Sequence, residues 1–286
     1  MARQGGRPQA VGTVDAVWVE NRPTRGRRAV DRRELWQYRE LVRFLAGRDL
    51  KVRYKQAALG VGWAIVRPVI GALTLTVVFQ HVVDLSSDNI PYVPFALVGY
   101  SAWAYLSASL GGAGGSLVAN STLITKVYFP RVLAPLAAVI PGLVDLAVSA
   151  VPLVIAMAWY GLRPGPELLL LPLWVAGLVA CAFGVGLWFA TLNVRYRDAA
   201  ALLAVALQLL FFLSPIVYPG SQVPEVWRPV YFVNPVAGLV SGLRWSLLGG
   251  PWPGPPMAVS AVVIVVALWG GLRYFQAAER RFADVI

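Results

Sequence analysis

Long apolar stretches dominate this sequence, and each is about as long as a helix that crosses a bilayer. A spanning helix needs roughly 20 consecutive, mostly apolar residues. Six stretches approach or meet that length, at residues 61–83, 95–118, 137–160, 169–192, 200–218 and 257–275. Only 14% of the chain is charged, against about 25% in a typical soluble domain. A soluble core could not bury so much apolar surface, so we predict an all-α integral membrane protein with six transmembrane helices per protomer.

The basic residues indicate the orientation of these spans. The net charge is +11, and residues 1–60 hold 14 of the 25 Lys and Arg. If the N-terminus is cytoplasmic, 21 basic residues lie on the cytoplasmic side and three lie outside. The positive-inside rule therefore predicts that both termini are cytoplasmic. A basic segment beside membrane spans is typical of a membrane surface, so we expect no nucleic-acid partner.

The region before the first span divides into two parts. Residues 1–30 are rich in Arg and Gly and lack the apolar core of a signal peptide, so we predict a disordered basic tail. Residues 31–58 are predicted to form an amphipathic helix at the cytoplasmic membrane interface. Four of its apolar side chains recur at helical spacing, namely Leu35, Tyr38, Val42 and Leu45. A solvated linker helix is the alternative. The six-span membrane domain would occupy residues 59–280, and residues 281–286 would form a cytoplasmic tail.

The outer segment between the fifth and sixth spans is apolar and aromatic, unlike a solvated loop. It runs from about Pro219 to Pro256, and Asn234-Pro235 divides it in two. The stretch 236–248 is too short to span a bilayer but long enough for an interfacial helix. We therefore predict two short re-entrant helices on the outer side. Five residues there are candidates for an outer gate: Trp227, Tyr231, Asn234, Arg244 and Trp245.

Several kinds of chemistry find no support in the sequence. The single Cys181 rules out an internal disulfide, and the single His81 rules out a His-x-x-x-His metal motif. None of the three lysines follows a glycine, so the chain has no Walker A loop. We expect no catalytic residue, no metal and no cofactor bound by this chain. An integral membrane enzyme or a proton-coupled transporter stays an alternative, although each would need more clustered ionisable groups.

Five short motifs occur in order along the chain. They are RDLKVRY with LGVGW within residues 48–63, KVYFPR at 126–131, NVRYRD at 193–198, SPIVYP at 214–219 and NP at 234–235. Together they resemble the permease (transmembrane) subunit of type-2 ABC transporters, in the branch that exports polysaccharides such as O-antigen and teichoic acid. The resemblance covers about residues 31–280.

The resemblance implies a particular machine. Such permeases are homodimers in the bacterial cytoplasmic membrane, and two copies of a separate ABC ATPase subunit dock on their cytoplasmic face. That subunit binds ATP and Mg, and a lipid-linked glycan passes outward through a channel at the dimer interface. The chain itself would not be an enzyme. A permease that exports drugs or other small lipophilic molecules is the close alternative.

Two cytoplasmic loops are candidate contacts for the ATPase subunit. Tyr128 and Phe129 could fill a groove on the partner, with Lys126 and Arg131 as a charged rim. The full candidate set is Lys126, Tyr128, Phe129, Pro130, Arg131, Arg195, Arg197 and Asp198. The alternative is that these residues only anchor the loops at the lipid headgroups.

Two further sets lie within the spans. Arg67 and Asp145 have opposite charges at similar depth, which predicts an intramembrane ion pair; snorkelling of Arg67 to the interface is the alternative. Aromatic rings could line a glycan channel, and the candidates are Trp63, Tyr100, Trp103, Tyr105, Phe211 and Phe212. Ordinary lipid-facing or interfacial placement would also explain them.

Overall fold

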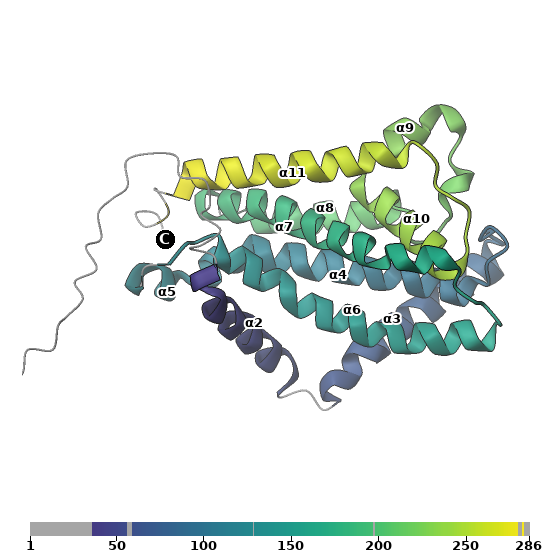
Figure 1. Ribbon diagram of the computed structural model, residues 1–286, viewed down its shortest axis with the longest axis horizontal. Coiled ribbons are helices and arrows are strands. Elements are labelled where there is room, and N and C mark those ends of the chain that lie inside the picture. Colours follow the sequence, from purple (N-terminus) through teal and green to yellow (C-terminus); the bar gives the residue numbers. More distant parts are fainter. Residues whose placement is uncertain (1–35, 56–58, 128, 197, 280–281, 283–286) are drawn as a thin grey trace, which may run out of the picture.

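The computed structural model describes residues 36–55, 59–127, 129–196, 198–279 and 282. The predicted tail at residues 1–30, Tyr128 and Arg197 lie outside these residues. Every regular element in the described part is helical (Figure 1), which agrees with the all-α prediction. The α-helices are α2 (Arg39–Tyr54), α3 (Trp63–Leu75), α4 (Tyr92–Ala119), α5 (Ser121–Lys126), α6 (Leu133–Trp159), α7 (Leu171–Arg195), α8 (Ala199–Leu213), α9 (Arg228–Tyr231), α10 (Pro235–Leu248) and α11 (Met257–Ala278).

Five helical segments are long and apolar enough to cross a membrane. Short 3₁₀ or π-helical turns extend two of them beyond their α-helical cores. The five segments are Gly60–Val82, Tyr92–Ala119, Leu133–Trp159, Pro166–Arg195 and Met257–Ala278. They correspond to the first four predicted spans and the last one.

The fifth predicted span is not a helix of spanning length. Its helix, α8, has only 15 residues, or roughly 22 Å at 1.5 Å per residue, while the hydrocarbon core of a bilayer is about 30 Å thick. The predicted stretch 200–218 contains Pro215, which disfavours helical geometry at Ser214. Ser214 accordingly adopts a ψ of 155°, and the helix ends there.

Helix α4 forms the centre of the bundle. It contacts α3, α6, α7, α8 and α10, and 72% of its most apolar window is buried within the protein. One end of the bundle carries α2, α5 and the last turns of α11 (Figure 1). The other end carries α9, with α10 nearby. The two short outer helices predicted around Asn234-Pro235 are present as α9 and α10; their insertion into a membrane stays a prediction.

Helices α7 and α11 approach each other backbone to backbone. A Cβ atom on Gly184 would lie 2.7 Å from the Cα of Leu268, so only glycine fits. Trp188 Nε1 donates to the carbonyl of Ala267 at 3.0 Å, and its ring stacks on Tyr274 with the centroids 5.0 Å apart. Small residues at such contacts are typical of helix packing in membranes.

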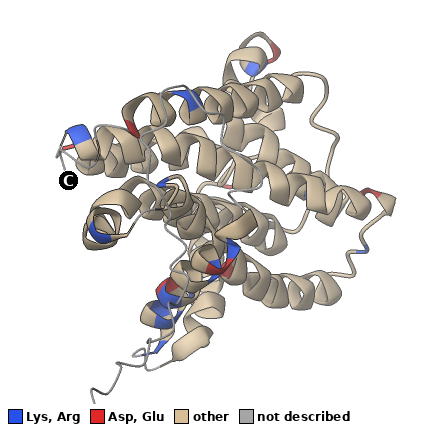
Figure 2. Ribbon diagram, turned by 60° about the vertical axis from the view of Figure 1, so that its left-hand side comes forward, with Lys and Arg blue, Asp and Glu red and all other residues tan. Residues whose placement is uncertain are grey.

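The outer surface of the bundle is largely apolar. Figure 2 shows most charged residues on α2 and near the helix ends, while the helix bodies carry few. Large side chains such as Ile155, Leu209 and Val265 are all about 60% exposed. A surface of this kind suits contact with lipid or with another membrane subunit.

Candidate functional site

The motif SPIVYP forms a buried, non-helical segment directly after α8. Ser214 and Ile216 are fully buried, so the carbonyl groups along this segment need hydrogen-bond partners. Two side chains from other helices supply them. Arg244 of α10 donates to the carbonyls of Pro215 at 2.5 Å and Ile216 at 2.9 Å, and Tyr92 of α4 donates to that of Val217 at 2.6 Å.

Arg244 also binds α4. Its Nε and Nη2 atoms donate to the carbonyl of Phe95 at 3.2 Å, and its guanidinium lies 3.3 Å from the centre of the Phe95 ring. A Cβ atom on Gly99 would lie 2.6 Å from Nη2, so glycine at that position admits the guanidinium. Burial lowers the pKa of Arg244 to about 9, and the side chain therefore stays charged at neutral pH.

Asn234 connects the same segment to the start of α10. Its side chain accepts from the N–H of Val236 at 3.0 Å, which caps the helix. Its Nδ2 donates to Ser214 Oγ at 2.8 Å. The motifs at 214–219 and 234–235 thus form one hydrogen-bonded unit. We call it the outer junction, and it consists of Tyr92, Ser214, Pro215, Ile216, Val217, Asn234 and Arg244.

The candidate outer-gate residues therefore have different surroundings. Asn234 and Arg244 belong to the outer junction, and Arg244 is only 5% exposed. Trp245 packs edge-on against Trp252 with the ring centres 4.5 Å apart. Tyr231 packs against Tyr218, and burial raises its pKa above the ordinary value. Trp227 is 62% exposed, and a gating role for these residues stays a prediction.

At the opposite end, the structure corrects the role predicted for Phe129. This side chain is 3% exposed and packs in a second apolar cluster with Leu133, Phe275 and Phe282. It cannot fill a groove on a partner, because it covers the ends of the protein's own helices. Pro130 accepts from the N–H of Leu133 in the turn that starts α6.

Arg131 is likewise engaged within the chain. Its backbone N–H donates to Glu279 Oε1 at 3.2 Å, and its guanidinium donates to the carbonyl of Glu279. The loop is thereby attached to the end of α11. Lys126, the last residue of α5, is exposed and stays available for a partner.

The second loop predicted to contact the ATPase subunit, between α7 and α8, remains accessible. Arg195 and Asp198 are exposed, and the Arg195 guanidinium lies 5.2 Å from the ring centre of Tyr196. Asn193 Nδ2 donates to the carbonyl of Gly114 at 3.2 Å and ties this loop to α4. No further interaction restrains Arg195 within the described part of the chain.

The predicted Arg67–Asp145 ion pair is wrong. Asp145 instead pairs with Arg53 and accepts a hydrogen bond from Tyr54. Burial, followed by the Asp145 carboxylate, raises the pKa of Tyr54 to about 12, so its hydroxyl stays protonated at neutral pH. The Arg67 guanidinium lies 5.8 Å from the ring centre of Trp63. The end of α2 reaches Asp145 because α2 packs against α6.

Sequence reasoning therefore missed Arg53 and Tyr54 as the residues that bind Asp145. Both residues belong to the motif RDLKVRY, which was the available signal. Arg48 of the same motif donates to Asn120 Oδ1 at 2.9 Å. Helix α2 is thus attached through polar side chains to both α4 and α6.

Two of the six channel candidates are core residues of the protomer. Trp103 and Tyr105 are 8% and 2% exposed, and a Cβ atom on Gly142 would lie 2.9 Å from the Tyr105 ring. They pack between helices and cannot line a path outside the protomer. Phe211 packs edge-on between Trp103 and Phe212. The more accessible candidates are Trp63, Tyr100, Phe211 and Phe212, for which a channel role stays a prediction.

The sequence profile of the family described as ABC-2 type transporter matches residues 40–248, from α2 to the end of α10. The chain belongs to this family. It is a multi-pass membrane protein of the transporter class, and its resemblance to the polysaccharide-export branch is confirmed by the relatives described below.

The relatives match over almost their full length. The chain is 32% identical to the O-antigen export system permease protein RfbA of Myxococcus xanthus over 260 residues, covering 89% of this chain and 98% of that protein. It is 29% identical to the RfbA protein of Klebsiella pneumoniae over 250 residues, covering 86% and 95%. It is 23% identical to the polysialic acid transport protein KpsM of Escherichia coli, covering 81% and 91%.

Proposed function

We propose that this protein is the transmembrane subunit of an ATP-driven exporter in the bacterial inner membrane. It would move a lipid-linked polysaccharide, such as O-antigen, teichoic acid or a similar cell-envelope glycan, from the cytoplasm outward. The observation that carries the proposal is the match to O-antigen export permeases over at least 95% of their length. A separate ABC ATPase subunit, with ATP and Mg, would supply the energy.

The end of the bundle that carries α5 is suited to transmit a force from such a subunit to the membrane helices. The short helix α5 presents Thr122, Thr125 and Lys126 to solvent. Directly after it, Phe129 is buried and Arg131 is bound to Glu279. A force on α5 would therefore pass to α6 and α11 through a packed element instead of a loose loop. In this proposal Lys126, Arg195 and Asp198 touch the ATPase subunit, while Phe129 and Arg131 hold the element in place.

The channel would form between two copies of the chain. Apolar side chains on the outer faces of the helices, including Phe212 at 61% exposure and Trp63 at 38% exposure, are free to contact a second protomer. In this arrangement α2, α5 and the end of α11 lie on the cytoplasmic side. The outer junction and α9 then lie near the exit.

Two measurements test the proposal. Deletion of the gene should remove a surface polysaccharide, and the wild-type gene should restore it. A C-terminally tagged protein, extracted in mild detergent, should co-purify with an ATPase that carries a Gly-Lys-Ser/Thr motif. A deletion strain with unchanged surface polysaccharide but increased drug sensitivity would favour export of small lipophilic molecules instead. A dimeric permease that purifies without any ATPase would contradict the proposal.

A further inference from the structure

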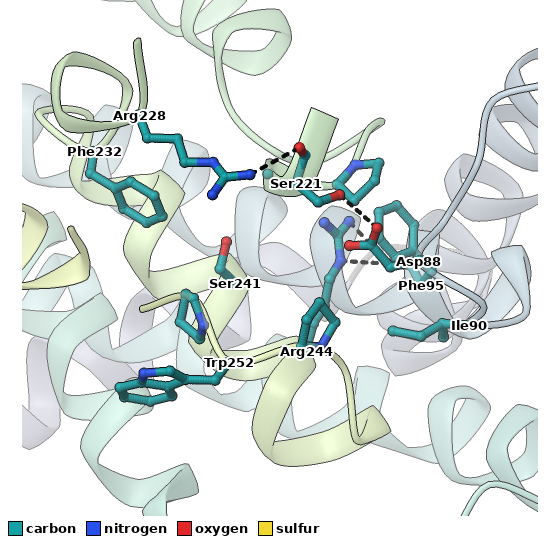
Figure 3. Close-up of a pocket in the computed structure, with 13 residues that line it drawn as sticks. Asp88, Ile90, Phe95, Ser221, Arg228, Phe232, Ser241, Arg244 and Trp252 are labelled. Carbon is teal, nitrogen blue, oxygen red and sulfur yellow. Dashed lines mark hydrogen bonds between the residues drawn. The ribbon is translucent and has the colours of Figure 1, made fainter. Parts of the chain in front are cut away.

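A small cavity, lined by both polar and apolar side chains, lies beside the outer junction. Its volume is about 200 Å³, below the roughly 300–1,000 Å³ of sites for drug-sized ligands. The loop before α4, the segment after α8, helices α9 and α10, and the loop before α11 all contribute to its wall (Figure 3). The residues that matter for its chemistry are Asp88, Ser221, Arg228, Ser241, Arg244 and Trp252.

Side-chain hydrogen bonds hold two of these walls together. Ser221 Oγ donates to Asp88 Oδ1 at 2.6 Å, and Gln222 Nε2 donates to the carbonyl of Ser86 at 3.2 Å. Asp88 adopts a φ of 56°, a left-handed conformation that aspartate tolerates better than most residues. The loop that carries Asp88 is therefore fixed against the segment after α8, and the carboxylate is positioned before any ligand arrives.

The cavity offers both hydrogen-bond donors and acceptors. Asp88 keeps acceptor capacity, because Ser221 supplies its one hydrogen bond within the described residues. Ser241 Oγ has no hydrogen-bond partner in the described part of the chain, and a hydroxyl can donate or accept. The guanidinium groups of Arg228 and Arg244 also line this space, as Figure 3 shows. Arg228 is paired with Glu225 at 3.5 Å, and Arg244 is bound to backbone carbonyls, so both guanidinium groups are held in place.

Apolar rings and proline form the rest of the wall. Phe95, Phe232 and Trp252 line the cavity together with Pro251 and Pro253. This mixture of charged, hydroxyl and apolar groups disfavours simpler ligands. A bare anion would face the Asp88 carboxylate, a bare cation would face two guanidinium groups, and an acyl chain would leave all these polar groups without partners.

A sugar ring meets each of these requirements. Its neighbouring hydroxyl groups donate and accept at once, its C–H faces pack on aromatic and proline surfaces, and it is smaller than a drug-sized ligand. We propose that this cavity binds a single pyranose unit of the exported glycan on the outer side of the membrane. The proposal rests on the proposed function, since it takes the glycan to be the substrate.

The test uses the purified full-length protein in detergent and a soluble probe. The probe is a set of short oligosaccharides released by mild acid from the surface polysaccharide that the deletion strain lacks. Saturation-transfer NMR measures their binding. Wild-type protein should bind the probe, and Ser241→Phe, which fills the cavity, should bind at least tenfold more weakly. Asp88→Asn, which removes the charge without changing the volume, should also weaken binding.

Val230→Phe is the matched control. Val230 lies on α9, is 62% exposed and does not line the cavity, so the same added ring should leave binding unchanged. A thermal unfolding curve shows whether Ser241→Phe folds. If that variant does not fold, binding by Asp88→Asn provides the test instead. The proposal is overturned if the wild type does not bind the probe, or if binding is equal in wild type and in a folded cavity variant.

The two proposals fail in different ways. Loss of surface polysaccharide on deletion, together with no binding by the purified protein, removes the cavity site and leaves the export function standing. Unchanged surface polysaccharide on deletion removes the export function itself. Normal binding by the wild type with loss in both cavity variants supports the sugar site.

Discussion

Replacement of Arg244 by alanine should destabilise the half of the protein that contains the outer junction. The variant removes every donor that binds the carbonyls of Pro215 and Ile216. Both residues lie in the buried segment after α8, and no other donor among the described residues reaches these two oxygens. The contact of the guanidinium with the Phe95 ring is lost as well.

The size of the effect follows from two opposing contributions. A buried acceptor left without a partner costs about 1–3 kcal/mol, so two carbonyls give about 2–6 kcal/mol. The variant also removes a buried charge, which relieves part of the desolvation cost of the guanidinium. We therefore expect the free energy of unfolding to fall by about 2–3 kcal/mol, at the lower end of that range. Since about 1.4 kcal/mol is a factor of ten, this corresponds to a roughly 30- to 150-fold shift in the equilibrium between the native protein and its opened, partly unfolded form.

The single cysteine provides the assay. Cys181 is the only cysteine in the chain and is 3% exposed, so a maleimide reaches it only when the protein opens. At low reagent concentration the labelling rate follows the population of the open state. Labelling of Arg244→Ala in detergent should be roughly 30 to 150 times faster than labelling of the wild type.

Arg244→Lys is the control for charge. A lysine keeps the positive charge but lacks the fork that binds several carbonyls at once, so its labelling rate should be intermediate. The reasoning is refuted if Arg244→Ala labels within threefold of the wild type. It is also refuted if lysine restores the wild-type rate, because charge alone would then be sufficient.

Three further predictions concern the remaining contacts. Asp145→Asn should loosen α2 from α6, so trypsin should cut within α2 several-fold faster than in the wild type, while helix content by circular dichroism stays unchanged. Gly184→Ala should lower the stability by about 1–3 kcal/mol in thermal unfolding, because its Cβ would overlap the backbone of α11. Gly115→Ala is the control: a Cβ there would meet no atom within 4 Å, so the stability should not fall. Phe129→Ala should cost about 3–5 kcal/mol and reduce the amount of folded protein, whereas Lys126→Ala should leave folding intact and weaken ATPase co-purification.

The helical class and most of the spans were predictable because hydropathy is summed over neighbouring residues. Five of the six predicted stretches coincide with long apolar helices. The exception is the stretch 200–218. It contains Pro215, which disfavours helical geometry at Ser214 and so ends α8. A window average hides a single residue of this kind, although the physical rule is local.

Pairings between helices were not predictable in the same way. Arg67 and Asp145 matched in depth and charge, yet Asp145 binds Arg53 and Tyr54. Depth along a helix says nothing about which way a side chain faces or how a preceding helix tilts. The role of Phe129 was predicted wrongly for a related reason. An aromatic side chain in a loop can pack against its own protein as readily as into a groove on a partner.

The linear sequence is sufficient to identify a helical membrane protein of the ABC-2 type, because apolar length, charge asymmetry and the order of motifs are properties of the linear chain. The contacts that those motifs make depend on how the helices pack. Arg244 lies 149 positions from Phe95 and 29 from Pro215, and it binds both carbonyls because α10 packs against α4. The outer junction and the neighbouring cavity exist only in that packing, since they depend on the rotation and tilt of helices that are far apart in the chain.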